Sequence, residues 1–383
     1  MQRACVQVRN RAAQPIIQKQ QMSNPSKHKA KRRRSAPTLE DVAKHAGVSP
    51  MTVSRVINGA STVREGTREL VAAAVRELGY SPNEAARNLA GARQIHIAML
   101  YAKPSAFIAE FLFGGLEQVR RHNAQFIVEK CSDVTRAVSE IERIVSDGAD
   151  GLLIAPPLAD SSQVLDFLET DDVPAVVVTS SQVRDSVSAV GIDAYKAARE
   201  MTRHLISMGH RSIGFIVGHP AHATSGLRLA GYRDAMSEAG LDCPDDYIAQ
   251  GDYTYRSGLD AAERLLSLEA KPTAIFASND EMAAAAAAVA HRYGLDVPAD
   301  LSVCGYDDTP LATAIWPQLT TIHVPIAELS RAAADLLVRA IRARQVGEAH
   351  DPQHIVLDYA LIRRQSDAAP RTRPEFRLSL HPE

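Results

Sequence analysis

The sequence predicts a small all-α domain near the N-terminus, followed by a large α/β core built from parallel sheets. Residues 38–78 show short amphipathic helical patterns, which are broken at Gly47 and restart at Pro50. From Ile95 onward, short apolar runs alternate with helical patterns, which is typical of parallel sheets with helices on both faces. A chain of 383 residues is long enough to bury two or three separate cores.

The composition argues against membrane, secreted and disulfide-bonded proteins. No run of about 18 apolar residues is present, and no apolar segment near the N-terminus precedes a small-residue cleavage site. The four cysteines form no CxxC pair and are expected to be free thiols in a reducing compartment: Cys5, Cys131, Cys243 and Cys304. We therefore expect a cytoplasmic protein with no metal site and no cofactor.

Charge is distributed unevenly along the chain. The first 36 residues carry ten Lys or Arg and no acidic residue, although the net charge of the whole chain is −2. Residues 37–91 are balanced, with six basic and six acidic residues, so the remainder is acidic. The basic run from Lys27 to Arg34 either contacts DNA phosphates without sequence preference or is a solvated tail, and the sequence leaves both interpretations open.

The first predicted helix begins after Thr38, whose hydroxyl can form a capping box with Asp41, and it ends at Gly47. Its apolar residues fall three and four positions apart on one face: Leu39, Val42, Ala43 and Ala46. Ser49 and Pro50 begin a second helix, since serine is a favoured N-cap and proline fits the first helical position.

The second helix is expected to end at Asn58-Gly59, and a third helix is expected over residues 67–78. The third helix should turn five apolar residues inward: Leu70, Val71, Ala74, Val75 and Leu78. Two short helices joined by a tight turn form a helix-turn-helix, whose second helix enters the major groove of DNA. Residues 83–90 can form a further helix, which is too short to persist alone in water.

The exposed side of the second helix carries groups that can read DNA. Arg55 can donate two hydrogen bonds to guanine, which discriminates between bases by about 1–3 kcal/mol. Outside a helix-turn-helix, an ordinary exposed arginine would be the better interpretation of Arg55. Pro50 and Met51 can contact thymine methyl groups. Hydroxyl and amide groups that can contact phosphates are Thr38, Ser49, Thr52, Ser54, Asn58 and Thr67.

The remainder of the chain predicts two doubly wound subdomains, because about 270 residues of alternating strands and helices exceed one ordinary domain. The apolar runs expected to form buried strands are 95–100, 126–128, 151–155, 175–178, 213–217, 274–277 and 301–303. The alanine run 283–288 is expected to be a helix that packs closely against a sheet.

Residues 38–91 resemble, without a gap, the headpiece and hinge of the LacI/GalR family of transcriptional regulators; they read TLEDVAKHAGVSPMTVSRVINGASTVREGTRELVAAAVRELGYSPNEAARNLAG. The resemblance implies that Pro50, Met51 and Arg55 read bases. It also implies that Leu89 is the hinge leucine that wedges into the minor groove, where an apolar side chain unstacks and bends DNA. A small packing contact between domains is the alternative role for Leu89.

The resemblance continues to about residue 365 through MGHRSIGFIVG, LRLAGYRDAM, PTAIFASNDEMAAAA, DLSVCGYDDTPLA and PQLTTIHVP. It implies a periplasmic-binding-protein-like core with three crossovers and a ligand cleft at the carboxyl ends of the strands. The expected parts are a basic arm (1–36), a helix-turn-helix domain (37–81), a hinge (82–92), a sensing core (93–365) and a tail (366–383). Within the core, subdomain one covers 95–192 and 324–348, and subdomain two covers 193–320 and 353–364.

The resemblance implies three polar residues in the cleft: Arg228, Asn279 and Asp307. A carboxylate facing a guanidinium suits a polyol, because each group can bond two neighbouring hydroxyls. For Asp280 and Asp308 we expect a cap or hinge contact instead. Aromatic residues near strand ends can stack on a sugar or pack as ordinary core residues: Phe107, Tyr253, Tyr306 and Trp316.

The family resemblance implies a repressor of carbohydrate uptake or catabolism genes that a sugar or sugar-derived effector releases from its operator. The alternatives are a repressor that needs a purine-type corepressor, or a dual activator and repressor. We expect no enzymatic activity, because GxGxxG after the first strand, P-loop, GxSxG and HExxH motifs are absent. Residues 366–383 lack leucine heptads, so we expect a homodimer on a pseudo-palindromic operator.

Overall fold

The computed structural model describes residues 37–57, 63–78, 80, 94–171, 173–179 and 184–371. The chain divides into two compact units, one up to Ala92 and one from Arg93 onward, which we call the headpiece and the core. Among the described residues, no helix is both long enough and apolar enough to cross a membrane.

The headpiece contains the predicted helices: α1 (Leu39–Ala46), α2 (Pro50–Ile57) and α3 (Glu65–Leu78). The capping box predicted at the start of α1 is present, because Thr38 Oγ1 accepts from the Asp41 N–H and Asp41 accepts from the Thr38 N–H. Gly47 ends α1 with a φ of 66°, a conformation that glycine adopts without strain. Ser49 Oγ then caps α2 by accepting from the Thr52 N–H at 3.1 Å.

A small apolar cluster holds the headpiece helices together: Val42, Ala43, Val53, Val71, Ala74 and Tyr80. Val71 and Ala74 are buried as predicted, but Leu70 is 59% exposed, so the prediction for Leu70 is wrong. Adjacent residues of an α-helix point about 100° apart, and α3 directs Val71 rather than Leu70 toward α1 and α2. His45 on α1 and Glu77 on α3 form a further contact of 2.8 Å.

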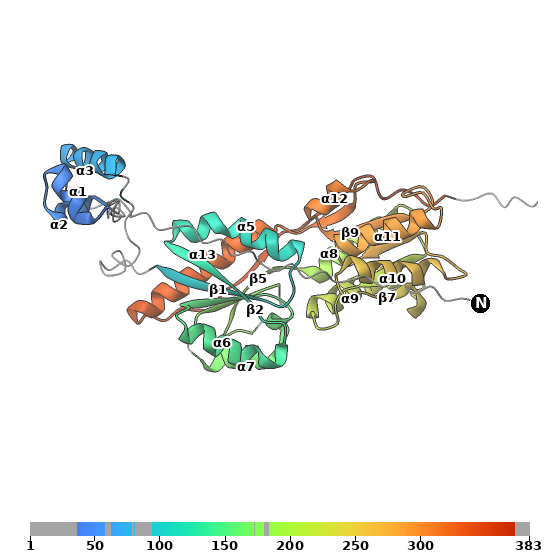
Figure 1. The fold of residues 1–383 in the computed structure, drawn as a ribbon. Helices are drawn as coiled ribbons and strands as arrows, with labels where there is room; N and C mark the ends of the chain where they lie inside the picture. The colour runs from blue at the N-terminus through green and yellow to red at the C-terminus, as the bar shows by residue number, and fades with distance from the viewer. Residues whose placement is uncertain are drawn as a thin grey trace, which may run out of the picture. The chain divides into compact units, whose positions relative to one another are not determined.

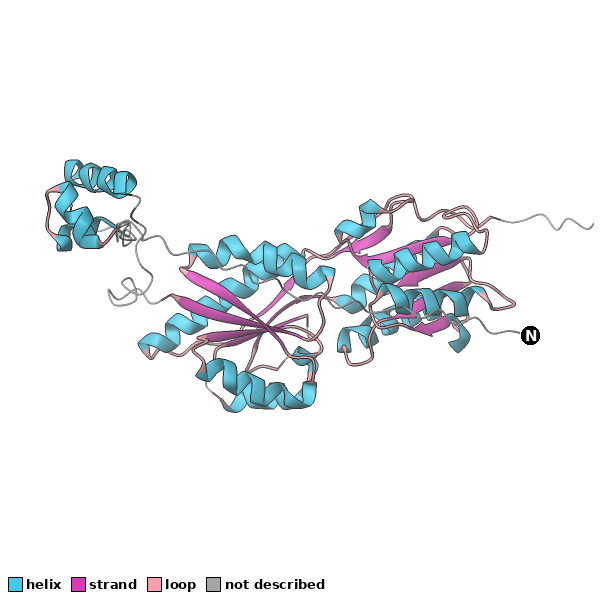
Figure 2. Cartoon of the chain, viewed as in Figure 1, coloured by secondary structure: helices cyan, strands magenta, loops and turns pink. Residues whose placement is uncertain are grey.

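The core contains two six-stranded sheets that are flanked by helices (Figure 1, Figure 2). The first sheet has the order β11-β5-β4-β3-β1-β2, with every strand parallel to its neighbours. Its strands are β1 (Ile95–Tyr101), β2 (Ala124–Lys130), β3 (Gly151–Ile154), β4 (Ala175–Val178), β5 (Ser188–Ile192) and β11 (His354–Leu357). Its helices are α5 (Ala106–Arg121), α6 (Ala137–Ser146), α7 (Ser162–Thr170) and α13 (Ile326–Val346).

The second sheet has the order β12-β10-β9-β8-β6-β7, and only β12 runs antiparallel to its neighbour. Its strands are β6 (Ile213–Val217), β7 (Ile248–Gln250), β8 (Ala274–Ala277), β9 (Ser302–Asp307), β10 (Thr320–His323) and β12 (Ala360–Ile362). Its helices are α8 (Ala194–Ser207), α9 (Ala223–Glu238), α10 (Tyr255–Leu266), α11 (Asp280–Arg292) and the short α12 (Pro310–Ala314).

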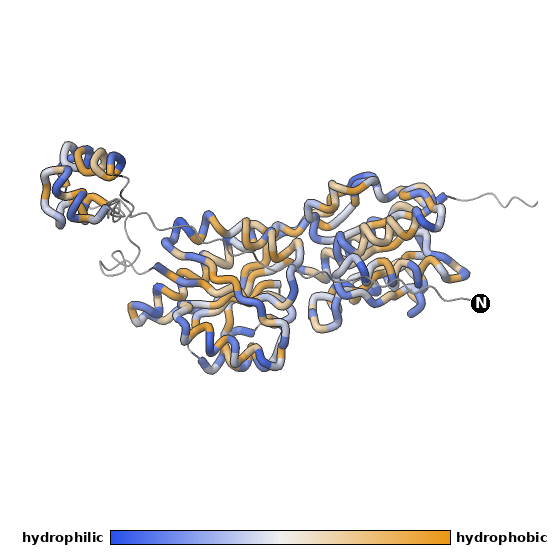
Figure 3. The backbone as a smooth tube through the Cα atoms, in the orientation of Figure 1, coloured by the Kyte–Doolittle hydropathy of each residue, from blue (hydrophilic) through white to orange (hydrophobic). Residues whose placement is uncertain are grey.

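Both faces of the central strands are buried, which explains why they read as continuous apolar runs (Figure 3). On β6, Phe215 belongs to the cluster beneath α8 and α9, whereas the adjacent Ile216 belongs to the cluster beneath α10 and α11. The predicted alanine-rich helix is the buried part of α11, where small side chains let the helix approach the sheet closely. The predicted fold class is therefore confirmed.

The C-terminal boundaries differ from the expected ones. Strand β11 pairs with β5 in the first sheet, so the assignment of the whole segment 353–364 to subdomain two is wrong, although β12 does join the second sheet. Beyond residue 365, Ser366 and Asp367 are buried, and Thr320 donates to the Asp367 carboxylate. The core thus extends into the segment expected to be a polar tail, because these polar side chains find hydrogen-bond partners inside it.

Candidate functional site

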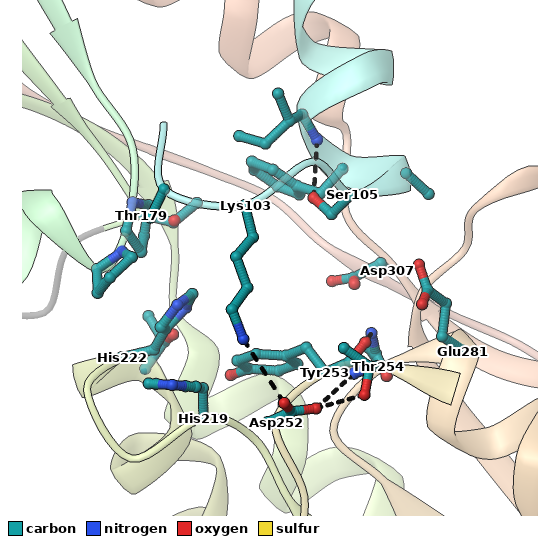
Figure 4. A pocket seen from close by; sticks show the side chains of 18 of the residues that line it. Lys103, Ser105, Thr179, His219, His222, Asp252, Tyr253, Thr254, Glu281 and Asp307 are labelled. Carbon is teal, nitrogen blue, oxygen red and sulfur yellow. Dashed lines mark hydrogen bonds and ion pairs between the residues drawn. The ribbon is translucent and has the colours of Figure 1, made fainter. Parts of the chain in front are cut away.

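A cleft of about 490 Å³ lies at the carboxyl ends of the strands of both sheets (Figure 4). Its walls are formed largely by the loops after β1 to β4 in the first subdomain and after β6 to β9 in the second. Because the strands of each sheet run parallel, the loops after them gather at one edge of the sheet. The chain passes between the subdomains after β5, after β10 and between β11 and β12, so the three crossovers expected from the sequence are present.

Arg228 on α9 is a buried cation at the base of this cleft, only 9% exposed. Its guanidinium carbon lies 3.7 Å from the centroid of the Tyr306 ring, and its Nη1 donates to the carbonyl of Ser278. Its Nη2 is 3.8 Å from the Asp307 carboxylate, whereas its Nε has no hydrogen-bond partner among the described residues. Arg228 is therefore fixed in position with donor capacity left for a ligand.

Asp307 ends β9 and is also 9% exposed. Within the described part of the chain, no group donates a hydrogen bond to its carboxylate, and Arg228 is its nearest cation. Burial raises the pKa of this carboxyl to about 8, and Arg228 opposes the rise only in part. Its φ is 102°, a backbone conformation that costs a non-glycine residue about 1–3 kcal/mol. Backbone strain and a strongly raised pKa at one residue are features that cluster at functional sites.

Tyr253, which follows β7, forms an aromatic surface in the cleft and has a φ of 71°. Asn279 holds its backbone, because Asn279 Nδ2 donates to the Tyr253 carbonyl at 2.9 Å. Asn279 Oδ1 accepts from the Met282 N–H at 3.0 Å and so caps α11. The Tyr253 ring covers Gly218 so closely that an added Cβ would overlap it. Its hydroxyl lies 2.8 Å from Ser225 Oγ.

An ion pair spans the cleft between the two subdomains. Lys103 reaches from the loop after β1 to Asp252, with 3.6 Å between Nζ and Oδ2 (Figure 4). Burial opposes ionisation of Asp252, but hydrogen bonds from Thr254 and Ser257, with the charge of Lys103, lower its pKa to about 2. On the same side of the cleft as Thr179 lie His219 and His222, whose pKa values are lowered by burial, that of His222 to about 4.

Five of the seven ligand residues predicted from the sequence line the cleft: Phe107, Arg228, Tyr253, Asn279 and Asp307. Tyr306 does not line it, because its ring is fully buried beneath Arg228. Trp316 does not line it either and is 76% exposed on the surface of the core. The local contact expected for Asp280 agrees with the structure, since its carboxylate accepts hydrogen bonds from Thr309 and Thr321.

Sequence reasoning missed most of the charged residues of the cleft: Lys103, Lys130, His219, His222, Asp252 and Glu281. Each lies at or shortly after the end of a strand, or at the start of the helix that follows it, and this position was the signal available in the sequence. Within the described ranges, no group of three or more His, Cys, Asp or Glu side chains is arranged to hold a metal ion.

The headpiece presents the predicted base-reading residues on one surface of α2. Val53 is buried against α1 and α3, while Pro50, Met51 and Arg55 are exposed, Met51 by 64%. In the described part of the chain, Arg55 forms no ion pair or hydrogen bond, so its guanidinium is available to a partner. An α-helix with exposed donors of this kind fits the width of the major groove.

The polar residues predicted to contact phosphates lie beside this surface. Thr38 and Ser49 are exposed and already cap α1 and α2, and Thr52 and Ser54 are partly exposed. The α2 N-terminus, with its partial positive charge, can itself attract a phosphate. Two further predicted DNA contacts lie outside the described residues: Asn58 and Leu89.

Models of known protein families match both the headpiece and the core. The model of "Bacterial regulatory proteins, lacI family" matches residues 38–83, and the model of "Periplasmic binding protein-like domain" matches residues 202–366. The chain is 33% identical to catabolite control protein A of Priestia megaterium over 332 residues, which cover 86% of this chain and 98% of that protein.

Solved structures agree over the same length. A complex of the transcriptional regulator CelR with cellobiose is 33% identical, with a TM-score of 0.65, and covers 86% of this chain and 99% of that one. A lac repressor dimer bound to operator and the anti-inducer ONPF is 30% identical, with a TM-score of 0.71, and the match covers 88% of this chain and 100% of that one. The chain therefore belongs to the LacI family of bacterial regulatory proteins and is a DNA-binding transcriptional regulator.

Proposed function

We propose that this regulator represses genes of carbohydrate uptake or catabolism, and that a sugar or sugar-derived effector bound in the cleft releases it from its operator. The observation that carries the proposal is the buried pair of Arg228 and Asp307, which face the cleft with unused hydrogen-bonding capacity. Buried polar groups without partners are costly, so a ligand that supplies hydroxyl groups to both gains binding free energy there.

The side chains that line the cleft support a sugar as the ligand. Tyr253 from the second subdomain and Phe107 from the first both line it, and an aromatic ring packs well against the C–H face of a sugar. Asp307 can accept two hydrogen bonds and the Arg228 guanidinium can donate, which suits neighbouring hydroxyls. A similar protein, CelR, has been solved with the disaccharide cellobiose.

The link to DNA runs through an equilibrium between arrangements of the two subdomains. A ligand that contacts both walls favours the arrangement in which the walls are close enough for it to touch both at once. We propose that this change acts on the hinge (82–92) of a homodimer, so that Leu89 leaves the minor groove and operator affinity falls. We also propose that residues 1–36 form a basic arm and residues 37–81 the helix-turn-helix domain, as the sequence predicts.

The test is operator binding measured by fluorescence anisotropy, with and without mono- and disaccharides. We expect at least one sugar to weaken operator binding by about tenfold or more, as allosteric coupling of this kind does. Arg228→Ala and Asp307→Ala should each abolish the response, while Trp316→Ala, which changes a residue outside the cleft, should retain it. Failure of every sugar to change operator affinity would contradict the proposal, and a ligand that strengthens operator binding would favour the corepressor alternative.

A further inference from the structure

The charged residues of the cleft are divided between its two walls. Both lysines belong to the first subdomain: Lys103 lies in the loop after β1, and Lys130 is the last residue of β2. The carboxylates that line the cleft all come from the second subdomain: Asp252, Asp280, Glu281 and Asp307. Among the residues that line the cleft, the first subdomain therefore contributes positive charge and no carboxylate.

The N-terminus of α5 adds to the positive character of this wall. Ser105 caps the helix by accepting from the Ile108 N–H at 3.2 Å, and the first turn of α5 lines the cleft. The backbone N–H groups of Ala106 and Phe107 have no hydrogen-bond partner among the described residues. A helix of 16 residues carries a partial positive charge at this end, and free N–H groups there bind anions.

The two lysines are available to a ligand. Lys130 is exposed and forms no ion pair within the described ranges of the chain. Lys103 is paired only with Asp252, at 3.6 Å, and its side chain is 64% exposed. The Thr254 N–H and Oγ1 donate to Asp252 at 3.1 and 2.5 Å. Asp252 therefore stays satisfied when Lys103 turns toward another anion.

Opposite this wall, the second subdomain offers further donors and one negative region. The imidazoles of His219 and His222 face the cleft, with ring centroids 5.4 Å apart, and can donate N–H groups. Arg228, more than nine-tenths buried, has an unpartnered Nε in the same cleft. Asp307 and Glu281 lie together on the other side, away from the histidines (Figure 4). Asp252 is the carboxylate nearest the histidines, and it is neutralised by Lys103 and Thr254 (Figure 4). The uncompensated negative charge therefore lies at the end with Asp307 and Glu281.

We propose that the effector is a sugar derivative that carries a carboxylate or phosphate group. The anionic group lies against Lys103, Lys130 and the N-terminus of α5, while the hydroxyls of the sugar face Arg228 and Asp307. Such a ligand joins the two walls through opposite ends of one molecule, which is what a ligand that changes their arrangement requires. This inference rests on the proposed function, because it names the chemical class of the effector for the same cleft.

The test compares matched ligands on the full-length protein by isothermal titration calorimetry. One series is glucose, glucuronate and glucose 6-phosphate, and a second is galactose, galacturonate and galactose 6-phosphate, with inorganic phosphate as a further probe. We expect one anionic member to bind about tenfold or more tightly than its neutral parent, as charge-assisted hydrogen bonds predict. Carboxylate and phosphate members within one series distinguish the two sources of charge.

Variants show whether the lysines carry this preference. The double variant Lys103→Gln, Lys130→Gln should reduce the preference, measured as the ratio of anionic to neutral affinity in the same variant, to about twofold or less. Lys271→Gln, which removes an exposed lysine outside the cleft, is the matched control and should keep it. The inference is overturned if the neutral sugar binds as tightly as its acid and phosphate, if the double variant keeps the preference, or if inorganic phosphate binds as tightly as the sugar phosphate.

The outcomes also separate this inference from the proposed function. A neutral sugar that binds and releases the operator without any preference for an anion overturns the anionic effector and leaves a sugar-responsive repressor in place. If no member of either series binds or changes operator affinity, the result counts against both.

Discussion

Replacing Asp307 by Asn is expected to stabilise the ligand-free core while making it insensitive to the effector. Asp307 is 9% exposed, and burial raises its pKa to about 8, so ionisation of its carboxyl group destabilises the folded core. Asparagine has the same shape, cannot ionise and is tolerated at a positive φ better than most residues. The substitution therefore removes the charge without removing volume or imposing a new backbone strain.

The pKa shift gives the size and the pH dependence of the effect. One pKa unit corresponds to about 1.4 kcal/mol. At neutral pH only the roughly three units between the unfolded pKa of 3.8 and the solution pH count, because the folded-state pKa of about 8 lies higher, so the upper limit is about 4 kcal/mol. The asparagine amide is also buried without a partner, which cancels part of the gain, and we expect about 1–3 kcal/mol. Because the folded-state pKa is raised, protonation of Asp307 stabilises the folded wild type. That stabilisation is fully present below the unfolded pKa of 3.8 and is lost as the pH rises through about 8.

Differential scanning calorimetry of the core transition, from about pH 4 to about pH 9, measures this difference. The melting temperature of the Asp307→Asn variant should exceed that of the wild type by about 2–4 °C per kcal/mol, and the gap should widen as the pH rises. A gap that is independent of pH, or that narrows toward alkaline pH, would show that the Asp307 carboxylate is not the titrating group and would refute the reasoning.

Three further changes test the DNA-binding unit. Arg55→Ala should lower discrimination at one symmetric base pair by about 1–3 kcal/mol, measured with operator variants, whereas a uniform loss of affinity for all DNA would assign Arg55 to the phosphates. Leu89→Ala should abolish specific operator binding in a gel-shift assay and leave calorimetric effector binding unchanged; an operator affinity equal to wild type would remove Leu89 from the groove. Deleting residues 1–36 should flatten the salt dependence of operator binding if the arm touches phosphates, and an unaltered slope would favour a solvated tail.

Local sequence signals predicted the headpiece and the central strands because their physical causes are local. A capping box at Thr38, a proline at the first position of α2 and fully buried strands such as β6 each leave a pattern within a few residues. Leu70 was assigned wrongly because α3 has a broad apolar surface, and only the packing of α1 and α2 decides which part of it is covered.

Other features depend on contacts between distant segments and left no such pattern. Strand β11 is an edge strand with alternating exposure, and its place beside β5 follows from the return of the chain to the first subdomain. Tyr306 lies in β9 and Trp316 in the loop before β10, yet one is buried beneath Arg228 and the other points to solvent. The pairing of Lys103 with Asp252 joins residues far apart in the chain, so periodicity cannot reveal it.

The division of the cleft between two subdomains leads to one more expectation. A ligand can shift the conformational equilibrium only by the difference between its affinities for the two arrangements, however tightly it binds. Arg228 and Asp307 both belong to the second subdomain, whereas Lys103 and Phe107 belong to the first. Contacts with the second subdomain alone are the same in both arrangements, so they supply affinity but no difference in affinity between the arrangements. The double variant Lys103→Ala, Phe107→Ala should therefore still bind effector, more weakly, but release much less operator even when the cleft is saturated. Full release of operator by the saturated double variant would mean that the first-subdomain wall has no part in the switch.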